Sequence, residues 1–278
     1  MRTISTKEIT DKVKALCISA ACDLEPDAAA AIKAAEAREE SPLGKEVLGQ
    51  IIENFGIAAK ENLPMCQDTG IAVFFVDLGR EAALDGSLED AINEGVRQGY
   101  KDGFLRKSVC HPLKRTNTGD NTPAIIHTRI TEGDRLKIKI APKGAGSENM
   151  SRLKMLKPAE GVEGVKKFVV ESIREAGGNP CPPIVVGVGI GGDFEKSAIL
   201  SKKALLRKVG ASNDDADVAK LESELLAEIN RLGIGPMGFG GTVTALAVHV
   251  ETHPCHIASL PVAVNIQCHA DRHKEAVI

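Results

Sequence analysis

Residues 64–76 carry the sequence PMCQDTGIAVFFV, in which a polar turn leads directly into a very apolar run. The run from Ile71 to Val76 has the composition of a buried strand. The turn before it places a thiol, a carboxamide and a carboxylate side by side, at Cys66, Gln67 and Asp68. Because a buried strand fixes the chain behind the turn, these side chains can be held rigidly. From the residues alone, Cys66 could be a packed core thiol, a nucleophile or a metal ligand.

The composition describes a chain that is large enough to bury a core but has few aromatic surfaces. It has 278 residues, 43% of them hydrophobic, and a formal net charge of −3, so no overall field attracts it to nucleic acid or anionic membranes. Only 3% of the residues are aromatic, which argues against base-stacking surfaces. No apolar signal segment is visible, and no run approaches the roughly 18 apolar residues of a membrane span. We therefore expect a cytoplasmic protein without nucleic-acid or membrane partners.

Helical and strand patterns together predict a mixed α/β (α+β) fold, with one domain over residues 1–278. Three helices are expected before residue 63, forming a layer packed with a mixed sheet. Ser5 or Thr6 can cap the first helix, and Ser41-Pro42 opens the third. Further helices are predicted at 88–100, 160–176, 194–208 and 214–231, and after the glycine-rich loop 233–242 through Val250. Strands are predicted after Gly70, at 184–188, at 257–266, and as a hairpin of 123–131 with 134–141.

Residues 187–192 match the G-x-G-x-x-G pattern of dinucleotide-binding loops, follow a predicted strand and open a predicted helix. However, this strand lies more than halfway along the chain. No acidic residue ends a second strand about 20 residues later, as contact with a ribose requires. We therefore favour a tight strand-to-helix turn, with Asp193 capping the helix, over the alternative of a glycine-loop nucleotide-binding module.

The seven cysteines are scattered and include no CxxC pair, so a disulfide framework is not expected. Any metal site must therefore combine distant segments. Cys66 and Cys181 each precede an apolar strand, and Cys268 follows one, whereas a lone cysteine is usually a small core residue. Position alone leaves a three-cysteine site and simple packing both open.

Histidines leave a zinc site as a further alternative. His249 and His253 have the i, i+4 spacing of ligands on a helix, but Pro254 ends any helix there and no third ligand stands out.

Several blocks of the sequence, in the same order over nearly the whole chain, resemble the α subunit of the two-subunit class I, iron–sulfur-dependent fumarate hydratases. The blocks are MCQDTG (65–70), KGAGSEN (143–149), CPPIVVGVG (181–189), LGIGP (232–236) and HIASLPVAVNIQCHA (256–270). The related tartrate dehydratase α subunits share the blocks at Cys66 and Cys181 but look less similar at 143–149 and 256–268. The resemblance therefore favours fumarate hydratase and keeps tartrate dehydratase as the alternative.

The resemblance implies a [4Fe–4S] cluster held by Cys66, Cys181 and Cys268, with one iron lacking a protein ligand. An open iron can act as a Lewis acid on a bound substrate. The implied reaction is the reversible hydration of fumarate to malate. By the same resemblance, Asp68 and His256 form the acid-side catalytic pair, although Asp68 taken alone could simply cap a turn.

The resemblance further implies that Gln67 and Arg106 bind oxygen atoms of a small dicarboxylate substrate, and that the backbone at Gly144 and Gly146 cradles a carboxylate. An arginine suits this task because its planar fork can bind a carboxylate through two hydrogen bonds. Arg106 alone could equally be a solvated charge at a helix end. In this family the base and further cationic residues belong to a β part, which the sequence lacks. We therefore expect a fumarase β subunit as the partner, in an α2β2 assembly.

Overall fold

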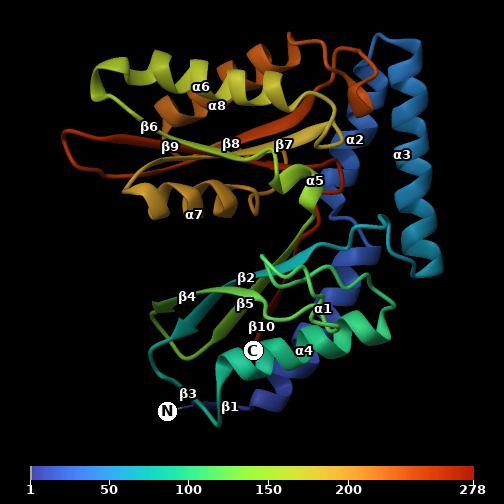
Figure 1. Cartoon of the computed structure of the whole chain (residues 1–278), viewed down its shortest axis with the longest axis vertical. Coiled ribbons are helices and arrows are strands. Elements are labelled where there is room, and N and C mark those ends of the chain that lie inside the picture. The colour runs from blue at the N-terminus through green and yellow to red at the C-terminus, as the bar shows by residue number, and fades with distance from the viewer. Residues whose placement is uncertain (1) are drawn as a thin grey trace. The chain divides into compact units, whose positions relative to one another are not determined.

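The computed structural model describes residues 2–278, which form two compact units. Unit 1 comprises Met1–Glu25, Asn54–Gly144 and Arg272–Ile278, and unit 2 comprises Pro26–Glu53 and Ala145–Asp271. Each unit has a hydrophobic core of its own. Each also combines helices with a mixed sheet (Figure 1), which confirms the predicted mixed α/β class. The single domain over residues 1–278 stays a prediction.

The sheet of unit 1 has the strand order β10–β5–β2–β4. Its strands are β2 (Ile71–Gly79), β4 (Ile125–Thr131), β5 (Leu136–Lys143) and β10 (Lys274–Val277). β2 pairs in parallel with β4 and antiparallel with β5, so it lies between the two strands that we predicted to form a hairpin. That prediction is wrong, because the largely buried β2 takes the central place, whereas the more exposed β4 suits an edge. Two further short strands, β1 (Arg2–Ile4) and β3 (Ala82–Leu84), pair in parallel.

Two helices, α1 (Thr6–Cys22) and α4 (Leu88–Asp102), cover one face of this sheet (Figure 1). The side chain of Ser5 accepts a hydrogen bond from the backbone of Lys7, so the predicted cap of the first helix is confirmed. Gly99 of α4 lies so near α1 that a Cβ there would stand 2.8 Å from the Cβ of Cys17. The two helices therefore pack at close range and fix the end of α4, where Tyr100 lies.

The sheet of unit 2 has the strand order β6–β9–β7–β8. Its strands are β6 (Arg152–Leu156), β7 (Ile184–Gly191), β8 (Ala245–His253) and β9 (Leu260–Gln267). β7 runs parallel to β8 and antiparallel to β9. The helices α6 (Gly161–Ala176) and α8 (Ala216–Asn230) lie on one face, and α7 (Phe194–Ala204) lies on the other (Figure 1).

The glycine pattern at 187–192 serves the packing of β7 against α7. A Cβ on Gly187 or Gly189 would collide with a backbone carbonyl oxygen of α7. The side chain of Asp193 accepts a hydrogen bond from the backbone N–H of Lys196 at 2.8 Å and caps α7, as predicted. The glycines therefore allow close strand–helix contact, which is the role we favoured over nucleotide binding.

The helix predicted to run through Val250 is wrong, because Ala245–His253 is β8. Its first six residues are all buried, and a continuous apolar run fits a strand covered on both faces as well as it fits a buried helix. The remaining helices are α2 (Pro26–Arg38), α3 (Pro42–Glu61), the short α5 (Ala145–Glu148) and two single 3-10 turns at 158–160 and 236–238. Within residues 2–278, no helix is both long enough and apolar enough to cross a membrane.

Candidate active site

The turn that precedes β2 in unit 1 is held by hydrogen bonds from several elements. The backbone N–H of Met65 donates to the carbonyl oxygen of Ala21 at 3.0 Å, and the side-chain amide of Asn54 donates to the carbonyl oxygen of Met65 at 2.8 Å. The Tyr100 hydroxyl lies 3.0 Å from the carbonyl oxygens of both Thr69 and Gly70, to which it can donate. The chain on both sides of Cys66 is therefore fixed to the core, as we expected for a turn in front of a buried strand.

Tyr100 and Asn121 form the buried support of this turn. The exposed fraction of Tyr100 is 1% and that of Asn121 is 0%. Burial raises the pKa of the Tyr100 hydroxyl, as do the nearby Cys17 and Asp68, whereas Arg272 acts in the opposite direction. Tyr100 therefore stays protonated and acts as a hydrogen-bond donor. The side-chain amide of Asn121 also donates to the carbonyl oxygen of Gly70, at 3.2 Å.

The carboxylate of Asp68 is oriented by its own turn. Its Oδ1 accepts the backbone N–H of Gly70 at 3.0 Å, so the turn-capping role that we considered is present. Its Oδ2 lies on the side of Gly144, where a Cβ would stand 3.2 Å from Oδ2 and 3.7 Å from Nη2 of Arg272. The structure thus brings Asp68 and Gly144 together and adds Arg272, which the sequence did not reveal. Because Gly144 has no side chain, nothing on its Cα separates its backbone from the carboxylate. The site roles of Asp68 and Gly144 stay predictions.

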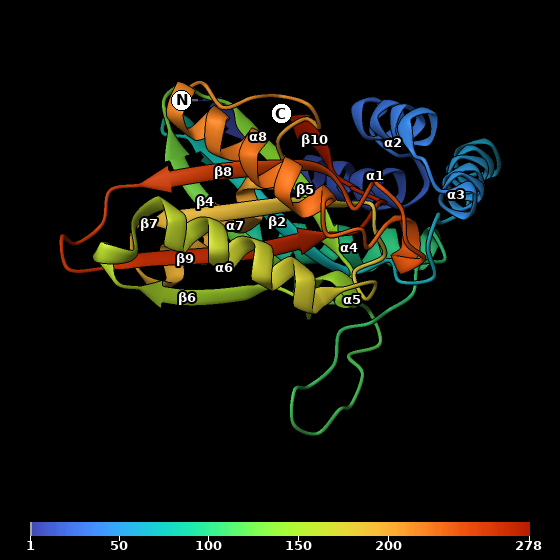
Figure 2. The same cartoon turned by 90° about the horizontal axis from the view of Figure 1, so that it is seen from above.

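Gln67 and Arg106 are both exposed, and Arg106 lies near the start of the long loop between α4 and β4, which is drawn in Figure 2. The hydroxyl of Thr69 donates to the carbonyl oxygen of Arg106 at 2.9 Å, which fixes the start of this loop to the turn. Within the loop, the backbones of Cys110 and Asn117 form an isolated antiparallel β-bridge. The structure therefore places the backbone of Arg106 beside the Asp68 turn and leaves its guanidinium group in solvent.

Cys181 and Cys268 come together at one end of the sheet of unit 2. Val185 at the start of β7 pairs with Gln267 at the end of β9, so the residues just beyond these strand ends are neighbours. The backbone N–H of His269 donates to the carbonyl oxygen of Cys181 at 3.3 Å, which ties the two cysteine segments directly. Both cysteines are half-buried. Gly146 lies at the same end of the sheet. A Cβ added to Gly146 would stand 3.5 Å from the carbonyl oxygen of Asn179.

The backbone at Cys181 is strained, since its φ of 57° lies in the left-handed region that non-glycine residues rarely adopt. The backbone N–H of Met237 donates to the carbonyl oxygen of Pro182 at 2.7 Å and holds this turn. Such strain persists only where the surroundings impose it, and it occurs preferentially at functional sites.

Burial separates some of the other cysteines from Cys66, Cys181 and Cys268. Cys17 and Cys22 are buried in the core, and burial raises the pKa of each thiol, whereas Cys110 is half-buried and Cys255 is exposed. Among residues 2–278, no three His, Cys, Asp or Glu side chains form a ready metal site. The ligand roles of Cys66, Cys181 and Cys268 therefore stay a prediction.

His256 lies at the opposite end of the same sheet from Cys181 and Cys268. It precedes β9, and Cys268 directly follows that strand. A strand of 8 residues with a rise of about 3.3 Å per residue separates the two ends by about 26 Å. Figure 2 shows the β8–β9 loop at one end of the sheet and α5 at the other. Unit 2 therefore does not bring His256 to the two cysteines of its own chain.

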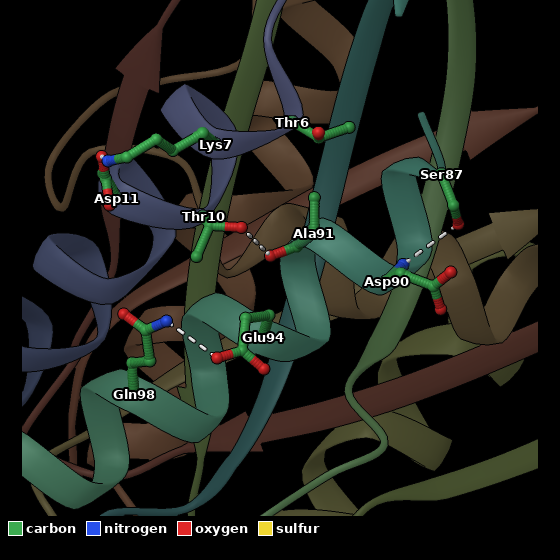
Figure 3. Close-up of a pocket in the computed structure, with 9 residues that line it drawn as sticks. All are labelled: Thr6, Lys7, Thr10, Asp11, Ser87, Asp90, Ala91, Glu94 and Gln98. Carbon is green, nitrogen blue, oxygen red and sulfur yellow. Dashed lines mark hydrogen bonds and ion pairs between the residues drawn. The ribbon is translucent and has the colours of Figure 1, made fainter. Parts of the chain in front are cut away.

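Two hollows in the surface were compared with the predicted site. The first, of about 580 Å³, lies between α1 and α4 and is drawn in Figure 3. Three carboxylates, those of Asp11, Asp90 and Glu94, line it with one ammonium group, Lys7, which pairs with Asp11. This charge repels a dicarboxylate. The second, of about 380 Å³, is mainly apolar and lies beside His256. Neither hollow is lined by Cys66, Cys181 or Cys268.

Comparison with known proteins decides the family. A family model described as "Fumarate hydratase (Fumerase)" matches residues 10–277. The chain belongs to the fumarate hydratase family. It is 48% identical over 273 residues, 95% of each chain, to the "Putative L(+)-tartrate dehydratase subunit alpha" of Methanocaldococcus jannaschii. It is 37% identical over 238 residues, 84% of this chain and 78% of the relative, to the "L(+)-tartrate dehydratase subunit alpha" of Escherichia coli K12. The resemblance inferred from the sequence blocks is thereby confirmed, and the chain is of the hydro-lyase type.

Three residues around the Asp68 turn were missed in the sequence. Tyr100 is the only tyrosine, and its place at the end of an amphipathic helix could have indicated a core anchor. Asn121 lies in a turn-rich stretch, in which no sequence pattern indicates that its side chain is buried. Arg272 follows Cys268 by four residues, and nothing in its neighbours indicates that it is buried.

Proposed function

We propose that this chain is the α subunit of a fumarate hydratase that, with a β subunit, adds water reversibly to fumarate to give malate. The observation that carries the proposal is the family match over residues 10–277, which includes all the predicted site residues. The relatives are named as alpha subunits, which supports a β partner. We infer an α2β2 assembly, in which the base and the residues that clamp the dicarboxylate come from the β subunit.

The chemistry of the thiols fits an iron–sulfur cluster. Cys181 and Cys268 are half-buried, and their segments are tied together at one sheet end. Cys66 is a half-buried thiol in a fixed turn. Clusters of this kind require thiolates. A bound [4Fe–4S] cluster, held by these three cysteines, would supply a Lewis acid for the substrate hydroxyl group.

The remaining site residues would bind and orient the dicarboxylate. Asp68 would move a proton to or from the leaving hydroxyl group, from the orientation that its bond to Gly70 imposes. The backbone of Gly144 would help to bind one carboxylate, and Gln67 and the exposed fork of Arg106 would bind substrate oxygens. Gly146, on the short α5 in unit 2, would contribute backbone only.

His256 would serve the active site of a second copy of the chain. The supporting observation is its place about 26 Å from Cys268 along β9. Proton transfer requires contact at about 3 Å. The turn that carries His256 is closed by a bond from the backbone N–H of Ser259 to the carbonyl oxygen of His256 at 2.9 Å, so it does not fold back along the sheet. An α2β2 assembly provides the second copy.

L(+)-tartrate is the second candidate substrate, because both relatives described above carry the name of tartrate dehydratase. A substrate panel separates the two candidates. The α–β complex, reconstituted anaerobically with iron and sulfide, should interconvert fumarate and malate faster than it dehydrates either tartrate enantiomer. A preference for L(+)-tartrate would establish the second candidate, and no turnover of any of them would refute both.

A further inference from the structure

Arg272 is a buried cation for which the fold gives no obvious structural partner. Its exposed fraction is 2%, and it is the largest of the fully buried side chains among residues 2–278. Its Nε and Nη1 atoms are enclosed and make no hydrogen bond. Burying a guanidinium group is costly unless it is paired, so a residue of this kind is retained only where its charge has a function.

The surroundings of Arg272 in unit 1 are the turn and the glycine of the proposed active site. Its Nη2 atom and Oδ2 of Asp68 both lie beside Gly144, at 3.7 Å and 3.2 Å from the position that a Cβ there would occupy. The Tyr100 hydroxyl, which fixes the same turn, is close enough to be influenced by the charges of both Asp68 and Arg272. Arg272 and the carboxylate of Asp68 therefore lie near each other beside Gly144.

We propose that Arg272 is a positioning residue, whose buried charge holds the carboxylate of Asp68 in the orientation from which it meets substrate. One oxygen of Asp68 is held by the backbone N–H of Gly70, and the other lies on the side of Gly144, where the positive charge of Arg272 attracts it. With its accessible surface nearly gone, Arg272 acts through Asp68 and does not touch substrate. The inference rests on the proposed role of Asp68 in the hydro-lyase reaction.

The test removes the guanidinium group of Arg272 by substitution and then adds guanidinium in solution. In the reconstituted α–β complex, Arg272→Ala should lower kcat about 100-fold, the cost of a misplaced catalytic group, with KM nearly unchanged. Millimolar guanidinium should restore a large part of kcat, because it can enter the space left by the side chain. Urea, which has a similar shape but no charge, should not. Arg272→Lys, which keeps the charge but loses the fork, should retain more activity than Arg272→Ala.

A second readout needs no substrate. The backbone N–H of Gly70 should exchange with solvent roughly tenfold faster in Arg272→Ala, since its bond to Asp68 loosens, and guanidinium should slow it again. Arg97→Ala, which removes an arginine of unit 1 that pairs with Glu94 and Asp120, should change neither kcat nor this exchange. If Arg272→Ala does not assemble, Arg272→Lys and Arg272→Gln take its place in both measurements.

The assignment would be overturned if hydrogen exchange at Gly70 were unchanged in Arg272→Ala. It would also be overturned if urea restored the kcat of Arg272→Ala as well as guanidinium does. A kcat that stays within threefold of the wild type would overturn it as well. Failure of the proposed function gives a different result, because the wild type would then turn over none of the substrates while the exchange measurement still reports on Arg272.

Discussion

A mixture of two inactive variants, His256→Ala and Cys181→Ala, should regain activity if His256 serves the site of a second copy of the chain. Alone, each variant lacks one component of every site. His256 and Cys268 stand at opposite ends of β9, a strand of 8 residues that is about 26 Å long. Contact for proton transfer extends over about 3 Å, so a single chain cannot supply both components to one site.

The expected recovery of activity follows from the two-fold symmetry of the α pair. When the two variants are co-expressed and assembled at random, about half of the α pairs contain one copy of each, and each such pair has one complete site of two. The expected activity is therefore about a quarter of the wild type. The assay is fumarate hydration by the purified, reconstituted mixture. When differently tagged α chains are used to isolate the mixed assemblies, these should show about half of the wild-type activity. Activity in the mixture no greater than in the separate variants would refute the reasoning, as would full activity of His256→Ala alone.

Three further predictions concern stability. Tyr100→Phe should lower the free energy of unfolding by about 1–3 kcal/mol in urea, because the carbonyl oxygen of Thr69 loses a buried donor; no change would contradict this role. Glu39→Gln should lower the free energy of unfolding by about 3 kcal/mol, since the buried carboxylate accepts hydrogen bonds from several backbone N–H groups, including that of Val243 at 2.8 Å. A thermal unfolding midpoint equal to that of the wild type would contradict this prediction. Burial and then Arg207 lower the pKa of His249 from 6.5 to about 4. The unfolded chain therefore binds the extra proton in this window, and stability is complete above pH 6.5 and falls by up to about 3 kcal/mol toward pH 4. His249→Gln should remove that part of the pH dependence, as urea unfolding at several pH values would show.

Local patterns predicted most of the elements because the deciding residues are close in sequence. The capping residues Ser5 and Asp193 stand where the structure has the starts of α1 and α7. The two errors have one cause, namely that strand partners are chosen by burial in the whole sheet. β4 and β5 look like a hairpin in sequence, yet β2 separates them. The run at 245–250 is apolar on every side, so its period could not distinguish a strand from a helix.

The candidate site was predictable only as far as its motifs reach. The segments of Cys181 and Cys268, which the sequence blocks single out, meet in unit 2, and Asp68 meets Gly144 in unit 1. Their roles in one site stay a prediction. The place of Arg272 depends on how the last strand returns to the sheet of unit 1, which no local pattern encodes. Likewise, only the antiparallel course of β9 reveals that His256 is remote from the cysteines of its own unit.

The central claim is that Cys66, Cys181 and Cys268 hold the iron–sulfur cluster. It is tested most directly by the iron and sulfide content and the visible absorption of the α–β complex after anaerobic reconstitution. The wild type should bind about four iron atoms per α chain. Each of the single variants Cys66→Ala, Cys181→Ala and Cys268→Ala should lose most of the iron and the broad absorption, whereas Cys255→Ala, which removes an exposed thiol of unit 2, should match the wild type. Full iron content in any of the first three variants, or an equal loss in Cys255→Ala, would contradict the account.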